Sequence, residues 1–159
     1  MLILMGRLGV NIEEVRKKNV PEPYVRFQFT SKRKRMTTII NNCGQTEHNH
    51  DRRAHMKGAA EIVLESCSSY LNELGQKVPL NDGIKQEFLN VITFYASQSL
   101  RTISFAYKDL KANEGGPEHD QLNEGDYLYE IEKGSYTLVG IIGIKDVIRK
   151  EVPDAVALC

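Results

Sequence analysis

The first clear pattern along the chain is an alternation of apolar and polar residues near the N-terminus. Val25, Phe27 and Phe29 alternate with charged or polar neighbours, and this period of two is typical of a half-buried β-strand. Residues 36–41 form a second apolar segment, separated from the first by a basic turn at residues 31–35. The pattern predicts a β-hairpin.

Two further strands are expected in the second half of the chain. Ile103, Phe105 and Tyr107 share one face of a strand predicted over residues 102–107. Residues 136–143 form a nearly continuous apolar run, which is typical of a strand that is covered on both faces.

Three segments have helical spacing instead. A weak pattern covers residues 3–18, and a stronger one covers residues 59–74 and ends at Gly75, which can adopt the left-handed conformation of a helix stop. Asn81 or Asp82 can cap a third helix. Its expected buried stripe comprises Ile84, Phe88, Val91, Ile92 and Tyr95.

These elements predict one fold class. Strands and helices are grouped without regular alternation, which favours an α+β fold with a largely antiparallel twisted sheet flanked by helices. A chain of 159 residues with 41% hydrophobic content is long enough for a single core.

Two polar stretches interrupt the predicted elements. Residues 42–53 are polar, contain two histidines and are typical of a surface loop. Residues 113–132 hold seven acidic residues and no lysine or arginine, so we expect a solvated excursion.

Charge and cysteine content exclude several classes of protein. The 21 basic and 21 acidic residues balance, so no global field attracts the chain to nucleic acid or to an anionic membrane. No apolar run approaches the ~18 residues of a membrane-spanning helix. The three cysteines are widely spaced and odd in number, which favours reduced thiols in the cytosol over a disulfide framework.

Common catalytic and phosphate-binding motifs are absent from the sequence. There is no G-x-x-x-x-G-K-[ST] loop, no G-x-G-x-x-G turn and no G-x-S-x-G elbow. The spacing of a zinc knuckle or of a helical histidine pair is missing from Cys43, His48, His50 and His55, so no metal site is predicted. Because the catalytic motifs are absent as well, no catalytic residue is predicted.

A nucleotide would therefore have to be held by side chains. Phe29 offers a flat apolar face for a base, and the cations of residues 32–35 could reach its phosphates. Phe29 could equally be a core residue of its strand and the cations a solvated turn. A nuclear localisation patch at residues 31–36 is a third interpretation, against which the balanced charge counts.

Four collinear segments decide between these alternatives, because together they resemble the nucleotide-binding (N) domain of P-type calcium-transporting ATPases, most closely the plasma-membrane, calmodulin-regulated type. Residues 29–36 (FTSKRKRM) are similar to that family's F-x-S-x-R-K-x-M segment, and residues 57–64 (KGAAEIVL) to its K-G-A-x-E-x-[IV]-L motif. Residues 100–109 (LRTISFAYKD) resemble its L-R-T strand. Residues 140–153 (GIIGIKDVIRKEVP) resemble the segment through which the family's chain leaves this domain.

The resemblance implies a role for each matching residue. Phe29 would stack on adenine, Lys34 and Lys57 would line the same pocket, and Arg101 would reach toward ribose and phosphates. Gly58 would keep the pocket wall low beside Lys57.

The resemblance also divides the chain. Residues 1–139 would be the nucleotide-binding domain, truncated at its N-terminus, and residues 140–159 the hinge and the start of the phosphorylation domain. Asp146 and Arg149 belong to the hinge and would act when the domains close on nucleotide. Val147 stands where the family has proline, so the hinge departs from the family pattern at this position.

The implied function is ATP binding without hydrolysis. The family's D-K-T-G-T, T-G-D and G-D-G-x-N-D motifs are missing, so Mg²⁺ and phosphoryl transfer would depend on the phosphorylation domain of a calcium-pumping parent. The expected partners are ATP and the parent's phosphorylation and actuator domains, at the cytosolic face of a membrane, without direct membrane or nucleic-acid contact by this segment. The alternative is a pseudo-domain or interaction module that kept the fold and lost ATP binding.

Overall fold

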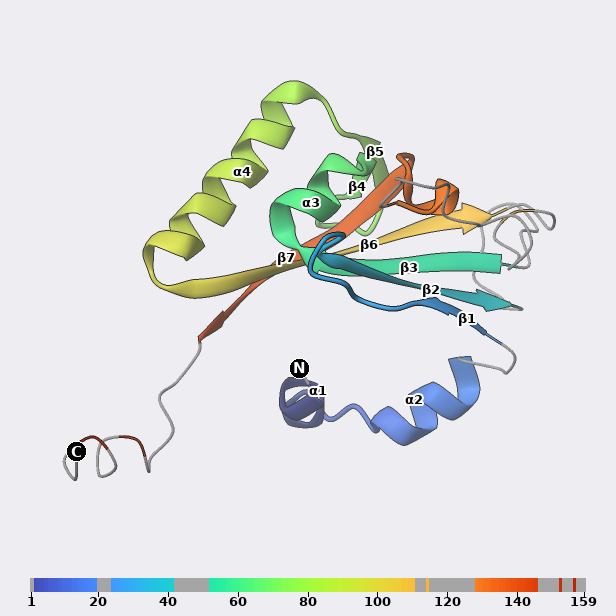
Figure 1. Ribbon diagram of the computed structural model, residues 1–159. Coiled ribbons are helices and arrows are strands. Elements are labelled where there is room, and N and C mark those ends of the chain that lie inside the picture. The colour runs from blue at the N-terminus through green and yellow to red at the C-terminus, as the bar shows by residue number, and fades with distance from the viewer. Residues whose placement is uncertain are drawn as a thin grey trace.

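A seven-stranded sheet forms the centre of the computed structural model, which describes residues 2–19, 24–41, 52–110, 114, 128–145, 152 and 156 (Figure 1). The strand order is β1-β2-β3-β6-β7-β4-β5. Neighbouring strands are antiparallel except β4 and β7, which are parallel. The strands are β1 (Val25–Phe27), β2 (Arg35–Asn41), β3 (Arg52–Ala59), β4 (Cys67–Leu71), β5 (Lys77–Pro79), β6 (Leu100–Leu110) and β7 (Tyr136–Lys145).

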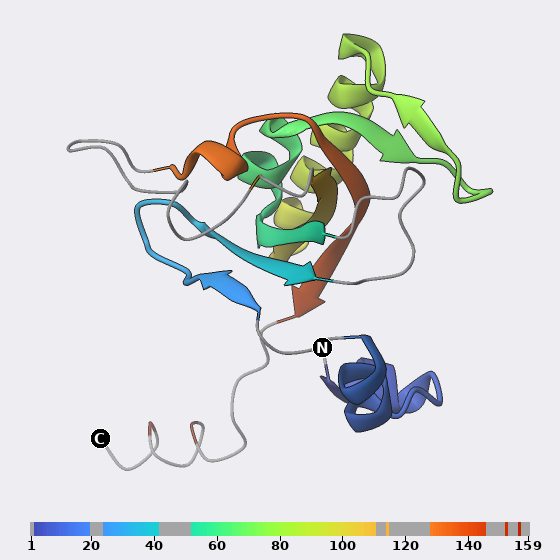
Figure 2. The ribbon, with the colours of Figure 1, turned by 90° about the vertical axis from the view of Figure 1, so that its right-hand side faces the viewer.

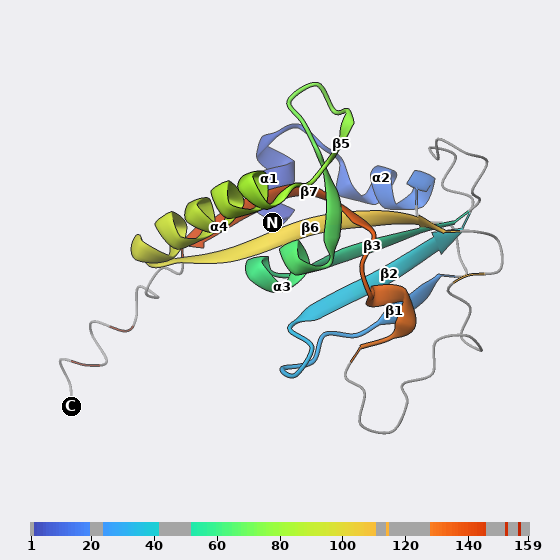
Figure 3. The same cartoon turned by 90° about the horizontal axis from the view of Figure 1, so that it is seen from above.

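Helices lie on both sides of this sheet, as Figures 1 and 2 show. One side carries α3 (Ala60–Glu65) and α4 (Asp82–Ser97), and the other carries α1 (Leu2–Arg7) and α2 (Ile12–Asn19). A 3-10 turn, η1 (Glu130–Glu132), is drawn in front of β1 in the view of Figure 3. The mostly antiparallel sheet with flanking helices confirms the predicted α+β class.

Strand register determines which side chains form the core. Thr37, Met56, Ala106 and Leu138 are aligned across β2, β3, β6 and β7, and all four are buried. Val63 of α3 packs in the same core cluster as Met56 and Ala106. The side of the sheet that carries α3 and α4 is therefore the main hydrophobic core.

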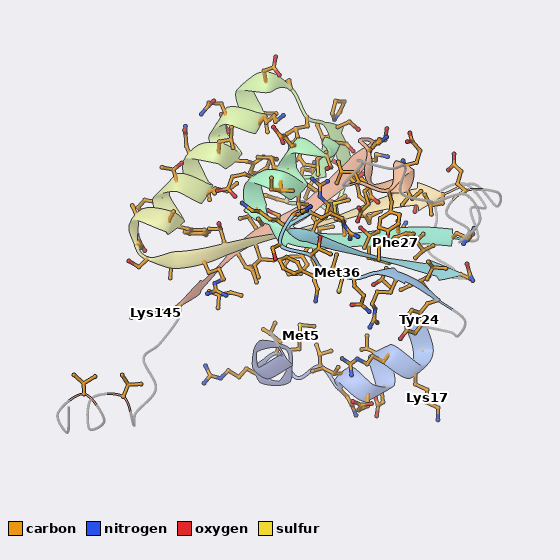
Figure 4. All side chains as sticks on the ribbon, in the orientation of Figure 1. Met5, Lys17, Tyr24, Phe27, Met36 and Lys145 are labelled. Atoms are coloured by element: carbon orange, nitrogen blue, oxygen red, sulfur yellow. The ribbon has the colours of Figure 1, made fainter. Side chains whose placement is uncertain are left out.

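The neighbouring row of residues points to the opposite side. Met36 pairs with Lys57, and Lys57 pairs with Phe105. Because side chains alternate between the faces of a strand, these three share the face away from α3 and α4. In Figure 4, Met5 lies on the side of α1 that is nearest to this face.

The predicted hairpin is confirmed, except for its last aromatic residue. β1 and β2 are antiparallel and are joined through the basic turn. Phe27 is 7% exposed, but Phe29 lies beyond the end of β1 and is 59% exposed. The alternation therefore stops before Phe29, and the alternative that made it a core residue is wrong.

The helix predicted over residues 59–74 is confirmed only for its first part, Ala60–Glu65. It ends at Glu65, and Cys67–Leu71 forms β4 instead. The ladder with β7 explains this, because the Tyr136 backbone N–H donates to the Ser66 carbonyl at 3.1 Å and the Ser69 and Thr137 hydroxyls are 2.9 Å apart. Gly75 lies in the turn between β4 and β5, with a left-handed φ of 74°.

The other helix predictions have mixed outcomes. Residues 3–18 form two helices, α1 and α2, with Gly9 between them at a φ of 73°. The cap of α4 is confirmed, because the Ile84 N–H donates to Asn81 Oδ1 at 2.9 Å. Val91, expected in the buried stripe, is 40% exposed.

The two polar stretches fall mainly outside the described residues. Residues 42–51 and most of residues 113–132 are in this category, so Cys43, His48 and His50 are too. At the end of the second stretch the expectation of solvent exposure is wrong, because Glu132 is fully buried. No helix in the described part of the chain is long and apolar enough to cross a membrane.

Candidate functional site

A cavity of about 710 Å³ opens beside the basic turn, on the sheet face away from α3 and α4. Residues from the hairpin, from β3 and from β6 meet there. The lining residues are Phe29, Ser31, Lys34, Met36, Lys57, Gly58, Ala59, Arg101, Thr102, Ile103 and Phe105.

The floor of this pocket is mainly apolar. Met36, Phe105 and the stem of Lys57 lie in one row across three strands, and Ile103 pairs with Ala59 in the adjoining position. Such a surface suits a flat, weakly hydrated ring, because contact with it removes apolar area from water.

The rim of the pocket is aromatic and cationic. Phe29 is 59% exposed and brings its ring to the pocket wall. Lys34, Lys57 and Arg101 also line the pocket and are exposed. An apolar floor with three cations at its edge is suited to a ligand that has a planar ring at one end and an anionic tail at the other.

The shape of the basic turn brings Lys34 to this rim. Its backbone N–H donates to the Thr30 carbonyl at 2.8 Å, and its φ of 52° lies in the left-handed region. A lysine adopts that conformation only where the surroundings hold it there, at a cost of about 1 kcal/mol or more. The Lys34 carbonyl accepts a hydrogen bond from the Ala59 N–H at 2.9 Å, which ties the turn to β3.

Gly58 is needed because this turn approaches β3 so closely. A Cβ atom at this position would overlap the Lys34 carbonyl oxygen and would lie 2.7 Å from Arg35 Cα. Real Cβ contacts are not that short, so a larger residue would push the basic turn away from β3. The closeness of the turn, more than the height of the pocket wall, accounts for glycine here.

Two of the four cations in the turn are buried behind the pocket. Arg33 is 5% exposed and Arg35 is 6% exposed. Arg33 Nη2 is 3.2 Å from Glu132 Oε1, and the Arg33 guanidinium lies 4.8 Å from the centre of the Tyr129 ring. The prediction that all four cations are available to phosphates is therefore wrong for Arg33 and Arg35.

Arg35 extends the buried network toward α3. Its Nη1 donates to Ser66 Oγ at 2.7 Å and its Nε donates to the Arg33 carbonyl at 3.3 Å. Burial lowers the pKa of Arg35, and the nearby Glu132 carboxylate opposes this effect. Glu132 thus forms an ion pair with Arg33 and stabilises the charge of Arg35. The acidic stretch in the sequence does not reveal this role.

The structure brings five of the seven predicted site residues together. Phe29, Lys34, Lys57, Gly58 and Arg101 all line the pocket, whereas Asp146 and Arg149 lie outside the described residues. Sequence reasoning missed the apolar floor. The strand period could have found part of it, since positions 103 and 105 share a face with position 101.

The described side chains offer no metal centre. No group of three or more histidine, cysteine, aspartate or glutamate residues in that part of the chain could hold an ion.

Comparison with known proteins identifies the family. The family described as "P-type ATPase, cytoplasmic domain N" matches residues 1–151. The chain is 38% identical over 160 residues to calcium-transporting ATPase PAT1 of Dictyostelium discoideum, an alignment that covers 99% of this chain and 12% of that protein.

Animal and plant relatives agree with this match. Plasma membrane calcium-transporting ATPase 4 of Homo sapiens is 38% identical over 88% of this chain and 10% of its own length. Putative calcium-transporting ATPase 7, plasma membrane-type, of Arabidopsis thaliana is 39% identical over 96% of this chain and 13% of its own length. The chain thus spans about an eighth of the length of these relatives, and with residues 1–151 matched it belongs to the family of P-type ATPase cytoplasmic N domains.

Proposed function

We propose that this domain binds ATP in the pocket beside the basic turn and presents it to a phosphorylation domain. The observation that carries the proposal is the pairing of an exposed aromatic ring, Phe29, with an apolar floor and three exposed cations. Adenine needs the first two features and a triphosphate needs the third. The family match supports the same function.

Six of the residues that line the pocket have a proposed task. Phe29 stacks on the adenine ring, and Met36 and Phe105 exclude water from beneath it. Lys34, Lys57 and Arg101 attract the ribose and the phosphate chain through long side chains. Because no backbone loop wraps the phosphates, we expect modest affinity, in the high-micromolar to millimolar range, or on the order of 4 kcal/mol.

The parent protein is proposed to be a calcium-transporting P-type ATPase, on the basis of the names of the relatives. Its phosphorylation and actuator domains would be the partners of this domain at the cytosolic side of a membrane. Mg²⁺ would be held by the phosphorylation domain, because this sequence has no D-K-T-G-T or G-D-G-x-N-D motif.

The hinge remains part of the proposal. Residues 1–139, together with the rest of β7 as far as Lys145 in the same sheet, would form the nucleotide-binding domain, and the later part of the predicted segment 140–159 would lead into the phosphorylation domain. Asp146 and Arg149 would contribute when the two domains close around bound nucleotide.

Titration of the chain with ATP, ADP and AMP, followed by NMR, tests the proposal. We expect saturable shifts at Phe29, Lys57 and Arg101 and only a modest loss from ATP to AMP. In a parallel incubation with γ-labelled ATP and Mg²⁺, we expect no hydroxylamine-sensitive label on the chain. Absence of shifts at several millimolar ATP in a folded sample would favour the alternative of a pseudo-domain or interaction module.

A further inference from the structure

We propose that Glu132 is a positioning residue for the nucleotide pocket: from its buried site behind the basic turn it holds Lys34 and Phe29 in place and so sets nucleotide affinity. It does not line the pocket and so would act without touching the ligand. This inference rests on the proposed function, since it concerns the affinity of the same pocket.

Glu132 reaches the hairpin from a distant part of the sequence. One carboxylate oxygen, Oε1, accepts hydrogen bonds from Thr37 Oγ1 at 2.7 Å and from Arg33 Nη2 at 3.2 Å. The other oxygen, Oε2, has no hydrogen-bond partner among the described residues. All three side chains are almost fully buried, so this contact is shielded from water and from salt.

Arg33 connects Glu132 to the backbone at both ends of the turn. The same Nη2 atom donates to the Phe27 carbonyl before the turn and to the Arg35 carbonyl after it, at 3.3 Å in each case. The Arg33 carbonyl in turn accepts from Arg35 Nε at 3.3 Å. Glu132 neutralises the guanidinium that makes these bonds, so the geometry of the turn depends on it.

The contact of Glu132 with Thr37 and Arg33 acts as a clamp on the segment between Phe27 and Thr37, which supplies four of the eleven residues that line the pocket. Phe29, Ser31, Lys34 and Met36 line the cavity and all lie between Phe27 and Thr37. Lys34 stands between the two buried arginines in a left-handed conformation that needs external support. Loosening the clamp should therefore relax Lys34 and let Phe29 leave the pocket wall, while β3 and β6 keep their positions.

A matched pair of buried threonines separates this effect from ordinary destabilisation. Thr37 and Thr137 are 0% and 1% exposed, and each makes one side-chain hydrogen bond, to Glu132 and to Ser69 respectively. Thr37→Val should weaken ATP binding about three- to tenfold, and Thr37→Ser, which keeps the hydroxyl, should restore it. Thr137→Val should leave the affinity unchanged even if it lowers the melting temperature equally.

A double-mutant cycle then tests the route. If Glu132 acts through the turn, Glu132→Gln should weaken ATP binding in the wild-type chain. In a variant that carries both Lys34→Ala and Phe29→Ala it should have little further effect, because the two side chains that it positions are already missing. Additive losses, or equal losses in Thr37→Val and Thr137→Val, would overturn the proposal. Where Glu132→Gln does not fold, the Thr37 pair still decides it.

Hydrogen exchange of the turn distinguishes failure of this inference from failure of the proposed function. The Lys34 and Ala59 amides, which are bonded within and beside the turn, should exchange faster in Thr37→Val than in Thr137→Val without any nucleotide. A wild-type chain that binds no ATP would reject the proposed function, and unchanged exchange in Thr37→Val would reject the clamp itself.

Discussion

The two sides of the segment from Phe27 to Thr37 differ in their exposure to solvent, although neighbouring residues of one short turn form both. On one side Phe29 and Lys34 are exposed in the pocket, and on the other Arg33 and Arg35 are buried, Arg33 in an ion pair with Glu132. Replacing an exposed group changes the stability of the fold little. A buried charge that loses its partner, in contrast, keeps the full cost of its desolvation and destabilises the fold. The pocket side should therefore govern affinity by direct contact, whereas the buried side should govern stability and, through the position of the turn, part of the affinity.

The largest expected effect is on the buried side. Glu132→Ala leaves the Arg33 guanidinium without its carboxylate, and we expect a loss of about 3–5 kcal/mol in the free energy of unfolding. Glu130→Ala is the control, because its ion pair with Lys133 is surface-exposed and worth about 0.5 kcal/mol. Urea denaturation measures both variants, and similar losses would contradict the contrast between the two sides.

Gly58→Ala should have the next largest effect, because it pushes the turn away from β3. The added methyl overlaps the Lys34 carbonyl, and we expect a loss of about 1–3 kcal/mol in stability together with weaker ATP binding. Gly140→Ala in β7 is the control, since a Cβ atom there meets nothing within 4 Å. Thermal unfolding that leaves Gly58→Ala as stable as Gly140→Ala would show that the turn adapts.

On the pocket side, Phe29→Ala should cost affinity and hardly any stability. Loss of the stacking face should weaken ATP binding by about 1–3 kcal/mol. Phe94 is a matched control, because it is 58% exposed on α4 where Phe29 is 59% exposed. Phe94→Ala should leave ATP binding unchanged in calorimetry. A fall in melting temperature for Phe29→Ala but not for Phe94→Ala would show that Phe29 contributes to stability, like the residues of the buried side.

Lys57→Ala should weaken ATP binding by a smaller, salt-dependent amount. Removal of one exposed cation near the phosphates should cost about 0.5–1 kcal/mol at low salt and less at high salt. Lys77→Ala, on the exposed strand β5, serves as the control. If the loss at Lys57 were as large at high salt as at low salt, its ammonium would have to be shielded in the complex.

The last effect is absent at neutral pH and concerns Cys67, next to the end of the buried network at Ser66. Burial raises the pKa of the Cys67 thiol to about 12, from 9.0. The folded chain thus keeps a proton that the unfolded chain loses, so this thiol lowers stability as the pH rises from about 9 to about 12. Compared with Cys67→Ser, the wild type should lose stability faster in urea titrations over that range, and parallel curves would show an accessible thiol.

Local patterns determined much of the fold. The period of two in Val25 and Phe27, the apolar run of β7 and the Asn81 cap are each visible within a few neighbouring residues, so these elements could be predicted. The expectation that β7 is covered on both faces is wrong, because Val139 is 51% exposed. The helix expected over residues 59–74 failed because β4 is stabilised by β7, some 70 residues further along, and no local signal shows that pairing. The face of β6 that is buried could not be predicted either, since the small residues Ser104 and Ala106 point to the core.

The sequence by itself determined the α+β class and, through four collinear motifs, five residues of the pocket. Only the tertiary structure decided how the charges of the basic turn divide. Lys34 and Arg35 are neighbours with the same charge, and one lies at the pocket rim while the other is buried. The environment of Arg35 depends on Glu132 and Ser66, residues far away in the sequence, and the free energy of a charge depends on what surrounds it.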